Sequence, residues 1–362
     1  MRKKTITEEE ELQVESDERD DEASKVKYDI ASYPSDFTLA GLTEMWKNGD
    51  ITIPDFQREF VWNIKQASLL IESFLLGLPV PPVFFYVDTE NKNLVIDGQQ
   101  RITSIIYFFE GFFGKANEHG KRKVFKLTGL HEKNPFYNKS FKDLNEADAR
   151  RLKNSVLRAL NIRQLSPKNE NTSVYHIFER LNTGGTPLSP QEIRNVVFRG
   201  KFVLLLKKLN KDHNWRKILG KKNIDRHQKD VELILRVFSL CNYINIYEKP
   251  MKEFLNEIMR RNKNGSTVNV TAFSKNFTKT TKLIVAKLGE KPFNIRGPLS
   301  TSALDSVFCT ILNNIDRIPS NVLVRYSKLK KDKRFFEYTS AATSDEKIVK
   351  ARFKYVKSKL IN

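Results

Sequence analysis

The five residues Asp97-Gly98-Gln99-Gln100-Arg101 constrain the fold of this 362-residue chain more than any other part of the sequence. They lie between an apolar run, Leu94-Val95-Ile96, and a segment with apolar residues at helical spacing, Ile102 to Phe109. This pattern predicts a strand, a tight glycine turn and the start of a helix. Unpaired backbone N–H groups and the positive end of the helix dipole then converge. We therefore predict a phosphate site, to which Arg101 adds guanidinium donors.

The same turn also has a purely structural interpretation. Asp97 would then be the N-cap of the helix, and Arg101 would be a solvated surface residue. Under the functional hypothesis, Asp97 caps the helix or holds a metal or a water. Gln99 and Gln100 would supply neutral groups that both donate and accept hydrogen bonds. The two glutamines and the arginine after the turn favour the functional hypothesis.

A second segment, Ile53 to Arg58, combines polar side chains with a proline that stiffens the chain. Gln57 and Arg58 come just before the aromatic residues Phe60 and Trp62. One hypothesis is that this segment borders a ligand site. Arg58 would then bind a phosphate, and Trp62 or Phe60 would stack on a base. The alternative is an aromatic pair in the core beside a solvated arginine. The sequence leaves both open.

A third segment, Phe178 to Ser189, predicts a helix end, a flexible turn and a new helix start. Gly184 and Gly185 form the turn, and Asn182 precedes it. Backbone N–H groups can converge on a ligand here, although a plain corner between two helices would also need glycine. The segment lacks the GK[ST] ending of a P-loop.

The helix that follows is predicted to start with a capping box. Ser189 would be its N-cap, Pro190 its first residue, and Glu192 would reach back to Ser189. A weaker candidate site lies further on, at Arg226 to Glu232, where His227 could be a general base. A polar helix face explains that segment adequately.

Periodicity predicts an α+β chain in three parts. Residues 1–34 are an acidic tail without folded structure, 35–170 an α/β domain, and 171–362 a helical domain. Residues 111–150 are predicted to be rich in loops. Strands are expected at 83–87 and 94–96, which form a hairpin, and at 157–165. Helices are expected at 66–77, 202–210, 229–243, 251–261, 273–288, 301–314 and 344–360.

The charge of the chain points to a polyanionic partner. The net charge is +20, and residues 1–25 hold ten acidic against five basic residues, so the remainder carries +25. A body this basic attracts nucleic acid. The alternative is that abundant lysine only keeps the protein in solution.

The remaining composition argues against several classes of protein. Cys241 and Cys309 lie in apolar helical segments without a CxxC partner or a nearby histidine pair, so we expect no zinc site and a cytoplasmic protein. No apolar run is long enough for a membrane span. The N-terminus becomes acidic where a signal peptide would need an apolar core.

Four segments in register resemble the N-terminal domain of GmrSD-type modification-dependent restriction enzymes, also known as domain of unknown function 262. They are Ile53 to Trp62, with Phe56 where tyrosine is usual, Leu78 to Pro82, Ile96 to Ser104, and Phe178 to Glu192. The resemblance spans about residues 37–240. It implies a fold similar to ParB and sulfiredoxin, followed by a helical extension.

The resemblance also implies that the chain binds and hydrolyses an NTP in defence against phage with modified DNA. We expect Mg²⁺ to bridge the phosphates, because hydrolysis of a polyanion generally requires it. It places Asp97, Gln100 and Arg101 in catalysis. It assigns the nucleotide site to Gln57, Arg58, Gly98, Gln99, Arg101, Thr103, Asn182, Gly184 and Gly185.

One departure from the family matters. Longer relatives continue into an HNH-type nuclease domain, and this sequence has no histidine after His227. We therefore expect an NTP-hydrolysing, DNA-associated protein that needs a partner nuclease chain to cut DNA. The oligomeric state is left open. One rival is a non-enzymatic adaptor switched by nucleotide, and the other is a metal-dependent DNase that uses Asp97 with Glu72 or Asp55.

Overall fold

The computed structural model describes residues 12–15, 29–53, 60–88, 90–114, 116, 120–166, 173, 176–177 and 189–362. The chain forms two compact units. One comprises residues 27–188, and the other comprises residues 1–26 together with 189–362. The first unit holds a mixed sheet and the second is helical, so the predicted α+β class is confirmed.

The first unit is built around a five-stranded sheet in the order β1-β7-β3-β4-β2. β1 and β7 pair antiparallel, as do β3 and β4, whereas β7 with β3 and β4 with β2 pair parallel. The hairpin predicted at 83–96 and the strand predicted at 157–165 are confirmed. The strands are β1 (Asp29–Thr38), β2 (Ile51–Thr52), β3 (Val83–Val87), β4 (Asn93–Asp97) and β7 (Val156–Ser166).

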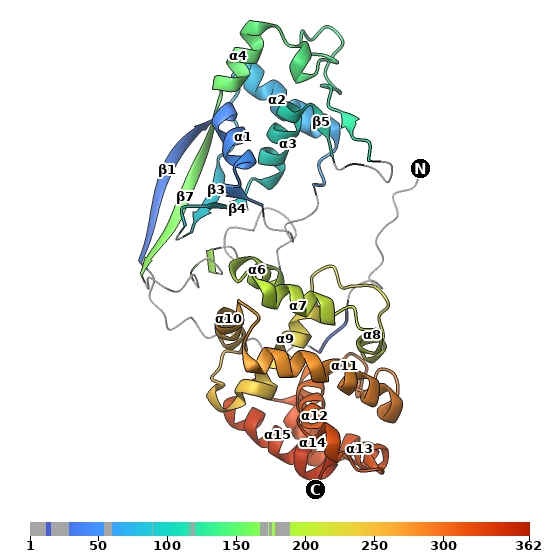
Figure 1. Ribbon diagram of the computed structural model, residues 1–362. Helices are drawn as coiled ribbons and strands as arrows, with labels where there is room; N and C mark the ends of the chain where they lie inside the picture. The colour runs from blue at the N-terminus through green and yellow to red at the C-terminus, as the bar shows by residue number, and fades with distance from the viewer. Residues whose placement is uncertain are drawn as a thin grey trace. The chain divides into compact units, whose positions relative to one another are not determined.

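Helices α1 (Leu39–Lys47), α2 (Ile64–Leu76) and α3 (Gln99–Glu110) lie on one face of this sheet (Figure 1). The core between them buries apolar side chains from the sheet, such as Phe85, and from the helices, such as Ile105. α2 begins at a capping box formed by Asn63 and Gln66 and ends at Gly77, close to the predicted bounds.

Two of the longer elements of this unit were missed from the sequence. β1 begins at Asp29, inside the range 1–34 that was assigned to an unfolded tail. This edge strand contains Pro34 and has no buried residue, so it shows no alternating apolar pattern. α4 (Glu146–Asn154) lies in the predicted loop region, and only Leu152 of this polar helix is buried. The other short elements there are β5 (Phe112–Phe113), β6 (Lys123–Val124) and η2 (Phe141–Asp143).

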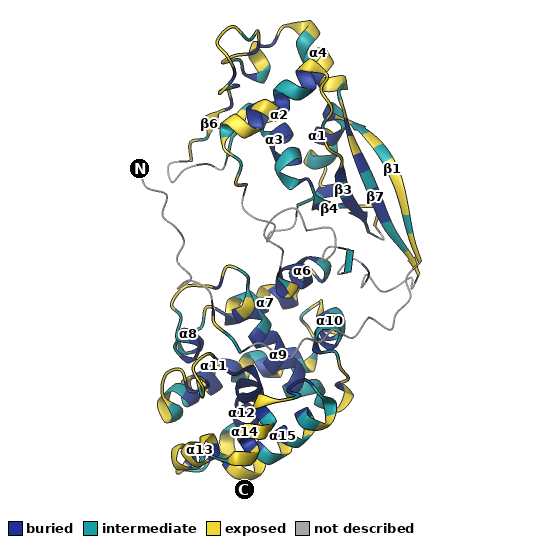
Figure 2. Ribbon diagram, turned by 180° about the vertical axis from the view of Figure 1, so that it is seen from behind, coloured by how far each residue is buried: buried dark blue, intermediate teal, exposed yellow. Residues whose placement is uncertain are grey.

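The second unit packs nine other described α-helices around α12 (Thr301–Asn313), of which only the last residue is not buried. Figure 2 shows α12 and α9 (Lys229–Tyr243) in dark blue. The others are α6 (Pro190–Val197), α7 (Lys201–Leu209), α8 (His213–Leu219), α10 (Met251–Asn262), α11 (Val268–Leu288), α13 (Val322–Lys330), α14 (Lys333–Ser340) and α15 (Glu346–Leu360), with 3-10 turns η3 (Ile244–Ile246) and η4 (Ile315–Arg317).

Most of these helices match the expected ranges, and α9 agrees at both ends. α8, α13 and α14, which have seven to nine residues each, were missed from the sequence. Among the described helices, none is long and apolar enough to cross a membrane.

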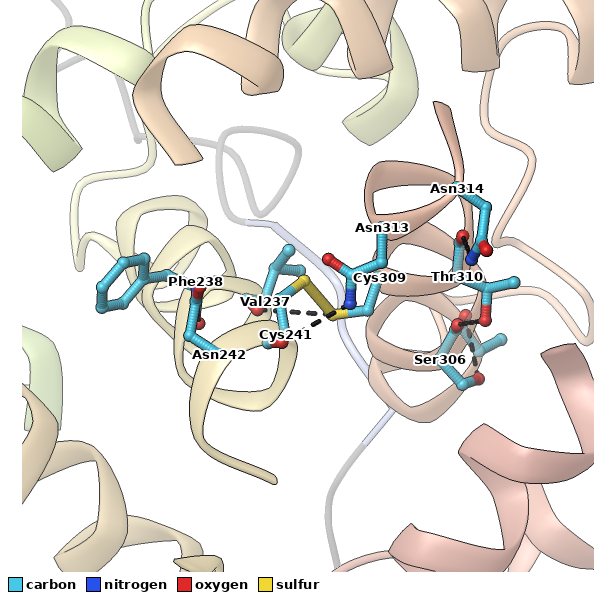
Figure 3. Close-up of a disulfide and its surroundings, with 10 residues drawn as sticks. Val237, Phe238, Cys241, Asn242, Ser306, Cys309, Thr310, Asn313 and Asn314 are labelled. Atoms are coloured by element: carbon cyan, nitrogen blue, oxygen red, sulfur yellow. Dashed lines mark hydrogen bonds between the residues drawn. A yellow bond between two sulfur atoms is a disulfide. The ribbon is translucent and has the colours of Figure 1, made fainter. Parts of the chain in front are cut away.

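The two cysteines form a disulfide, which the sequence had not indicated. Cys241 at the end of α9 bonds to Cys309 on α12, 68 residues away in the chain (Figure 3). Their pairing depends on how two helices pack, so spacing alone carried no signal. Because disulfides are rare in cytoplasmic proteins, the cysteines no longer support a cytoplasmic location.

Candidate functional site

The turn between β4 and α3 has the predicted strand, glycine and helix geometry. Gly98 is the N-cap of α3, with φ at 97°, and its carbonyl accepts the first helical hydrogen bond from Ile102 N at 3.0 Å. As a glycine, the N-cap residue makes no side-chain cap hydrogen bond to this helix start. The interpretation of Asp97 as an N-cap is therefore wrong, because Gly98 lies between that carboxylate and the first helical residue.

Gly98 cannot be replaced by a larger residue without a local shift. A Cβ atom at this position would lie 2.2 Å from Val83 Cγ1 and 2.7 Å from Val83 Cβ, which belong to β3. The positive φ adds a second requirement for glycine. The backbone at the start of α3 is thus held tightly against the neighbouring strand.

Arg101 is held beside this turn and is only 19% exposed. One terminal nitrogen of its guanidinium donates to Asp97 Oδ2 at 2.9 Å and to the Pro82 carbonyl at 3.1 Å. Its Nε is buried and has no hydrogen-bond partner among the described residues. A surface role for Arg101 is therefore wrong. Because an unpaired buried donor is costly, this N–H is a candidate contact for a ligand acceptor.

Asp97 ends β4, where it pairs in register with Phe84 of β3. Its side chain is 47% exposed while it accepts the hydrogen bond from Arg101. The carboxylate therefore has two features at once. It fixes the arginine at the start of the helix, and it keeps access to solvent, where it can contact a cation.

Gln100 contacts a neighbouring segment rather than open solvent. Its Oε1 accepts hydrogen bonds from the backbone N–H groups of Val61 and Trp62, at 3.0 and 3.1 Å. The side chain therefore fixes the segment before α2 to the start of α3. No sequence pattern indicated this role, because the two segments are 38 residues apart in the chain.

The aromatic residues that follow the second motif belong to the core. The Phe60 ring lies 5.1 Å from Tyr107 and 5.4 Å from Phe113, in edge-to-face contacts. Trp62 is partly buried against the same cluster. Of the two hypotheses for this pair, the structure supports packing and not a stacking platform.

The other predicted residues fall into two groups. Thr103 lies one turn into α3 and is 9% exposed, whereas Gln99 at the helix start is half-buried. The remaining predicted site residues lie outside the described residues, and they are Gln57, Arg58, Asn182, Gly184 and Gly185. Asp55 of the DNase hypothesis also lies outside the described residues.

The weaker candidates have structural partners. The predicted capping box of Ser189 and Glu192 at the start of α6 is confirmed. His227 Nδ1 lies 3.5 Å from a carboxylate oxygen of this Glu192. Glu72 accepts a hydrogen bond from Asn134 at 2.5 Å. Within the described ranges, no three His, Cys, Asp or Glu side chains are grouped so that they could hold a metal.

Part of the chain is similar to known proteins. Residues 39–199 match the family model of the GmrSD restriction endonuclease, N-terminal domain. Over 247 residues the chain is also 26% identical to an uncharacterized protein of Methanocaldococcus jannaschii. That alignment covers 47% of this chain and 42% of the relative, so the chain spans well under half of the relative's length.

Proposed function

Since residues 39–199 carry the N-terminal domain of the GmrSD restriction endonuclease family, we propose that this chain binds and hydrolyses an NTP and associates with DNA. The system it serves would be modification-dependent restriction or another defence against phage. The domain match supports the link to restriction. A cytoplasmic location and a ParB-like fold for the first unit are parts of the same proposal.

The start of α3 is the observation that carries the nucleotide site. The N-cap residue Gly98 makes no side-chain cap, its lack of a Cβ lets the turn pack against Val83, and Arg101 has a buried Nε without a described partner. Backbone N–H groups at a helix start together with a guanidinium suit a phosphate. We assign the triphosphate to this turn.

Each residue of the turn then has a distinct task. Arg101 binds a phosphate oxygen through the nitrogen atoms that Asp97 and Pro82 leave available. Asp97 fixes the guanidinium and offers its second carboxylate oxygen. Mg²⁺ commonly binds one or two carboxylates plus substrate phosphates, so Asp97 fits as a protein ligand to it. When bound, Mg²⁺ would neutralise charge on the phosphates.

Gln100 positions the site. Its Oε1 is occupied by the Val61 and Trp62 N–H groups, so only its amide NH₂ remains to contact a phosphate or an attacking water. We propose that Gln57, Arg58, Asn182, Gly184 and Gly185 complete the pocket, which rests on the family resemblance alone. Thr103 fits less well because it is buried.

A direct test measures hydrolysis of all four NTPs by the purified chain, with and without modified DNA. We expect turnover that requires Mg²⁺ and falls strongly in Asp97→Asn, a change that keeps a hydrogen-bond acceptor for Arg101. NTP binding without turnover under every condition would favour the adaptor instead. Absence of NTP binding would refute the proposal for this site.

DNA association is proposed from charge. The chain apart from residues 1–25 carries +25, so binding through phosphates should weaken by about one power of salt concentration for each phosphate contact. A fluorescence titration at several salt concentrations measures this slope. Binding that does not change with salt, or no binding at low salt, would contradict the proposal.

We further propose that these 362 residues do not cut DNA without a partner chain. A hydrolytic nuclease usually needs metal ligands grouped near one phosphate, and the described residues hold no such group. Plasmid DNA, modified and unmodified, should stay intact with Mg²⁺ or Mn²⁺ and each NTP. Nicking that disappears in Asp97→Ala would support the DNase rival.

A further inference from the structure

A short piece of the acidic N-terminus is bound to the helical unit, although residues 1–34 were predicted to be an unfolded tail. Leu12 is 4% exposed, and its N–H donates to Asp225 Oδ2 at 2.8 Å. Val14 forms a parallel β-bridge with Leu299. Leu299 donates to Gln13 O at 3.2 Å and accepts from Glu15 N at 2.9 Å. We call residues 12–15 the strap.

The strap ends on an arginine that is held ready for an anion. Arg296 donates from Nε and from one terminal nitrogen to the two carboxylate oxygens of Glu15, at 3.0 Å each. Its remaining donors are held by the end of α14, through the hydroxyls of Thr339 and Ser340 and the Thr339 carbonyl. The guanidinium fork therefore points at Glu15 in a fixed orientation. Such a fork fits a phosphate as well as a carboxylate.

The cleft around Arg296 has the features of a nucleic-acid site. It has a volume of about 510 Å³, and the strap residues Val14 and Glu15 form part of its wall. The Phe336 ring lines it, is 53% exposed and lies 5.1 Å from the Arg296 guanidinium. An exposed ring beside a fixed arginine can stack on a base while the arginine holds the phosphate. Hydroxyl groups line the rest of the cleft, from Thr301, Ser302, Thr339, Ser340 and Thr343.

The charges on both sides of the strap support a polyanion. Leu12 and Gln13 border a second cleft, of about 290 Å³, that Lys221 and Lys291 also line. Four glutamates precede the strap in the sequence, and Asp17 and Glu18 follow it closely. The strap thus lies on a surface with basic residues at both of its ends. The same surface would attract nucleic-acid phosphates if the strap left it.

We propose that the Arg296 cleft is a phosphate site for nucleic acid and that Glu15 occupies it as an internal competitor. A DNA phosphate displaces the Glu15 carboxylate from the guanidinium, and Phe336 then contacts a neighbouring base. This inference rests on the DNA association proposed above and names the surface that provides it. It is independent of the nucleotide site at α3.

The experiment compares DNA binding by the full chain and two variants that each remove one negative charge. Glu15→Gln removes the competing carboxylate. Glu248→Gln is the control, since Glu248 is an exposed residue of the same unit outside the cleft. Labelled single-stranded and duplex oligonucleotides are titrated at low salt. We expect Glu15→Gln to bind about fivefold more tightly than the wild type, while Glu248→Gln changes little.

Two further variants test the cleft itself. Arg296→Gln should weaken binding, and in its presence Glu15→Gln should no longer change the affinity, because the two substitutions act on one contact. Phe336→Ala should weaken single-stranded DNA more than duplex DNA. Melting temperatures are compared so that loss of folding is recognised. Inorganic tripolyphosphate is titrated as a competitor to separate nucleic acid from free phosphate compounds.

The outcomes separate this inference from the function on which it rests. Equal affinity of the wild type, Glu15→Gln and Glu248→Gln, with normal salt dependence, would overturn the strap proposal and leave DNA association intact. No DNA binding by any variant would refute both. Tripolyphosphate that displaces DNA completely at equal phosphate concentration would assign the cleft to free phosphate compounds instead.

Discussion

The starts of α3 and α6 are built in opposite ways. The start of α6 is capped by its own side chains. Ser189 Oγ accepts a hydrogen bond from Glu192 N at 3.2 Å, and the Glu192 carboxylate accepts one from Ser189 N at 2.7 Å. Pro190, the first helical residue, has no N–H group that would need a partner. α3 begins at Gly98, which makes no side-chain cap. The capping box of α6 satisfies N–H groups at its own helix start. We propose that α3 uses the N–H groups at its start to bind a phosphate.

The arginines near these two helix starts differ in the same way. Arg194 of α6 is 1% exposed, and its guanidinium nitrogens all donate, to Asn256, Gln191, Glu232 and the Lys252 carbonyl. Arg101 of α3 is paired at one terminal nitrogen, and its buried Nε has no described partner. A fully bonded arginine stabilises a core. A partly bonded one keeps donors for a ligand.

The largest expected effect is that of Gly98→Ala, which adds a Cβ where the turn before α3 packs against β3. The added Cβ would clash with Val83 and force an alanine to a φ of 97°. We expect a loss of about 3 kcal/mol or more in the free energy of unfolding, measured with urea. Gly111→Ala at the other end of α3 is the control. It has a φ of 83° but no atom within 4 Å of the new Cβ, so it should cost about 1 kcal/mol.

A smaller effect is expected where Gln100 joins α3 to the segment before α2. Gln100→Ala removes the acceptor for the Val61 and Trp62 N–H groups and should cost about 1–2 kcal/mol of unfolding free energy. Gln100→Glu keeps an acceptor and should retain most of the stability. Equal destabilisation by Gln100→Ala and Gln100→Glu, in thermal or urea unfolding, would show that the hydrogen bonds from Val61 and Trp62 do not contribute to the stability of the fold.

The smallest effect belongs to the closed helix start. Ser189→Ala removes one side of the capping box and should cost about 1 kcal/mol, with no change in NTP affinity. The comparison predicts this separation between stability and binding. A variant at Ser189 that bound NTP more weakly while it stayed folded would mean that α6 also contributes to the nucleotide site.

Local chemistry made part of this site predictable. The segment Asp97 to Arg101 indicated the strand, turn and helix, and Ser189 to Glu192 indicated the capping box, because glycine, proline and capping residues act over a few positions. The contacts of Gln100 with residues 61 and 62 and the pairing of Cys241 with Cys309 depend on segments distant in sequence. The binding of the strap at Arg296 likewise joins positions 281 residues apart. No local pattern could indicate these contacts.

The central claim is that the open start of α3 binds the phosphates of an NTP through Arg101. Calorimetric titration of each NTP into Arg101→Ala tests it, with Arg122→Ala as the matched control. Both arginines pair with a carboxylate at 2.9 Å in the same unit, but Arg122 pairs with Glu110 at the end of α3. Loss of a charge-assisted phosphate contact should cost Arg101→Ala about 1.5–3 kcal/mol, roughly tenfold to a hundredfold in affinity. Arg122→Ala should bind like the wild type. Equal NTP affinity of a folded Arg101→Ala and the wild type would contradict the account.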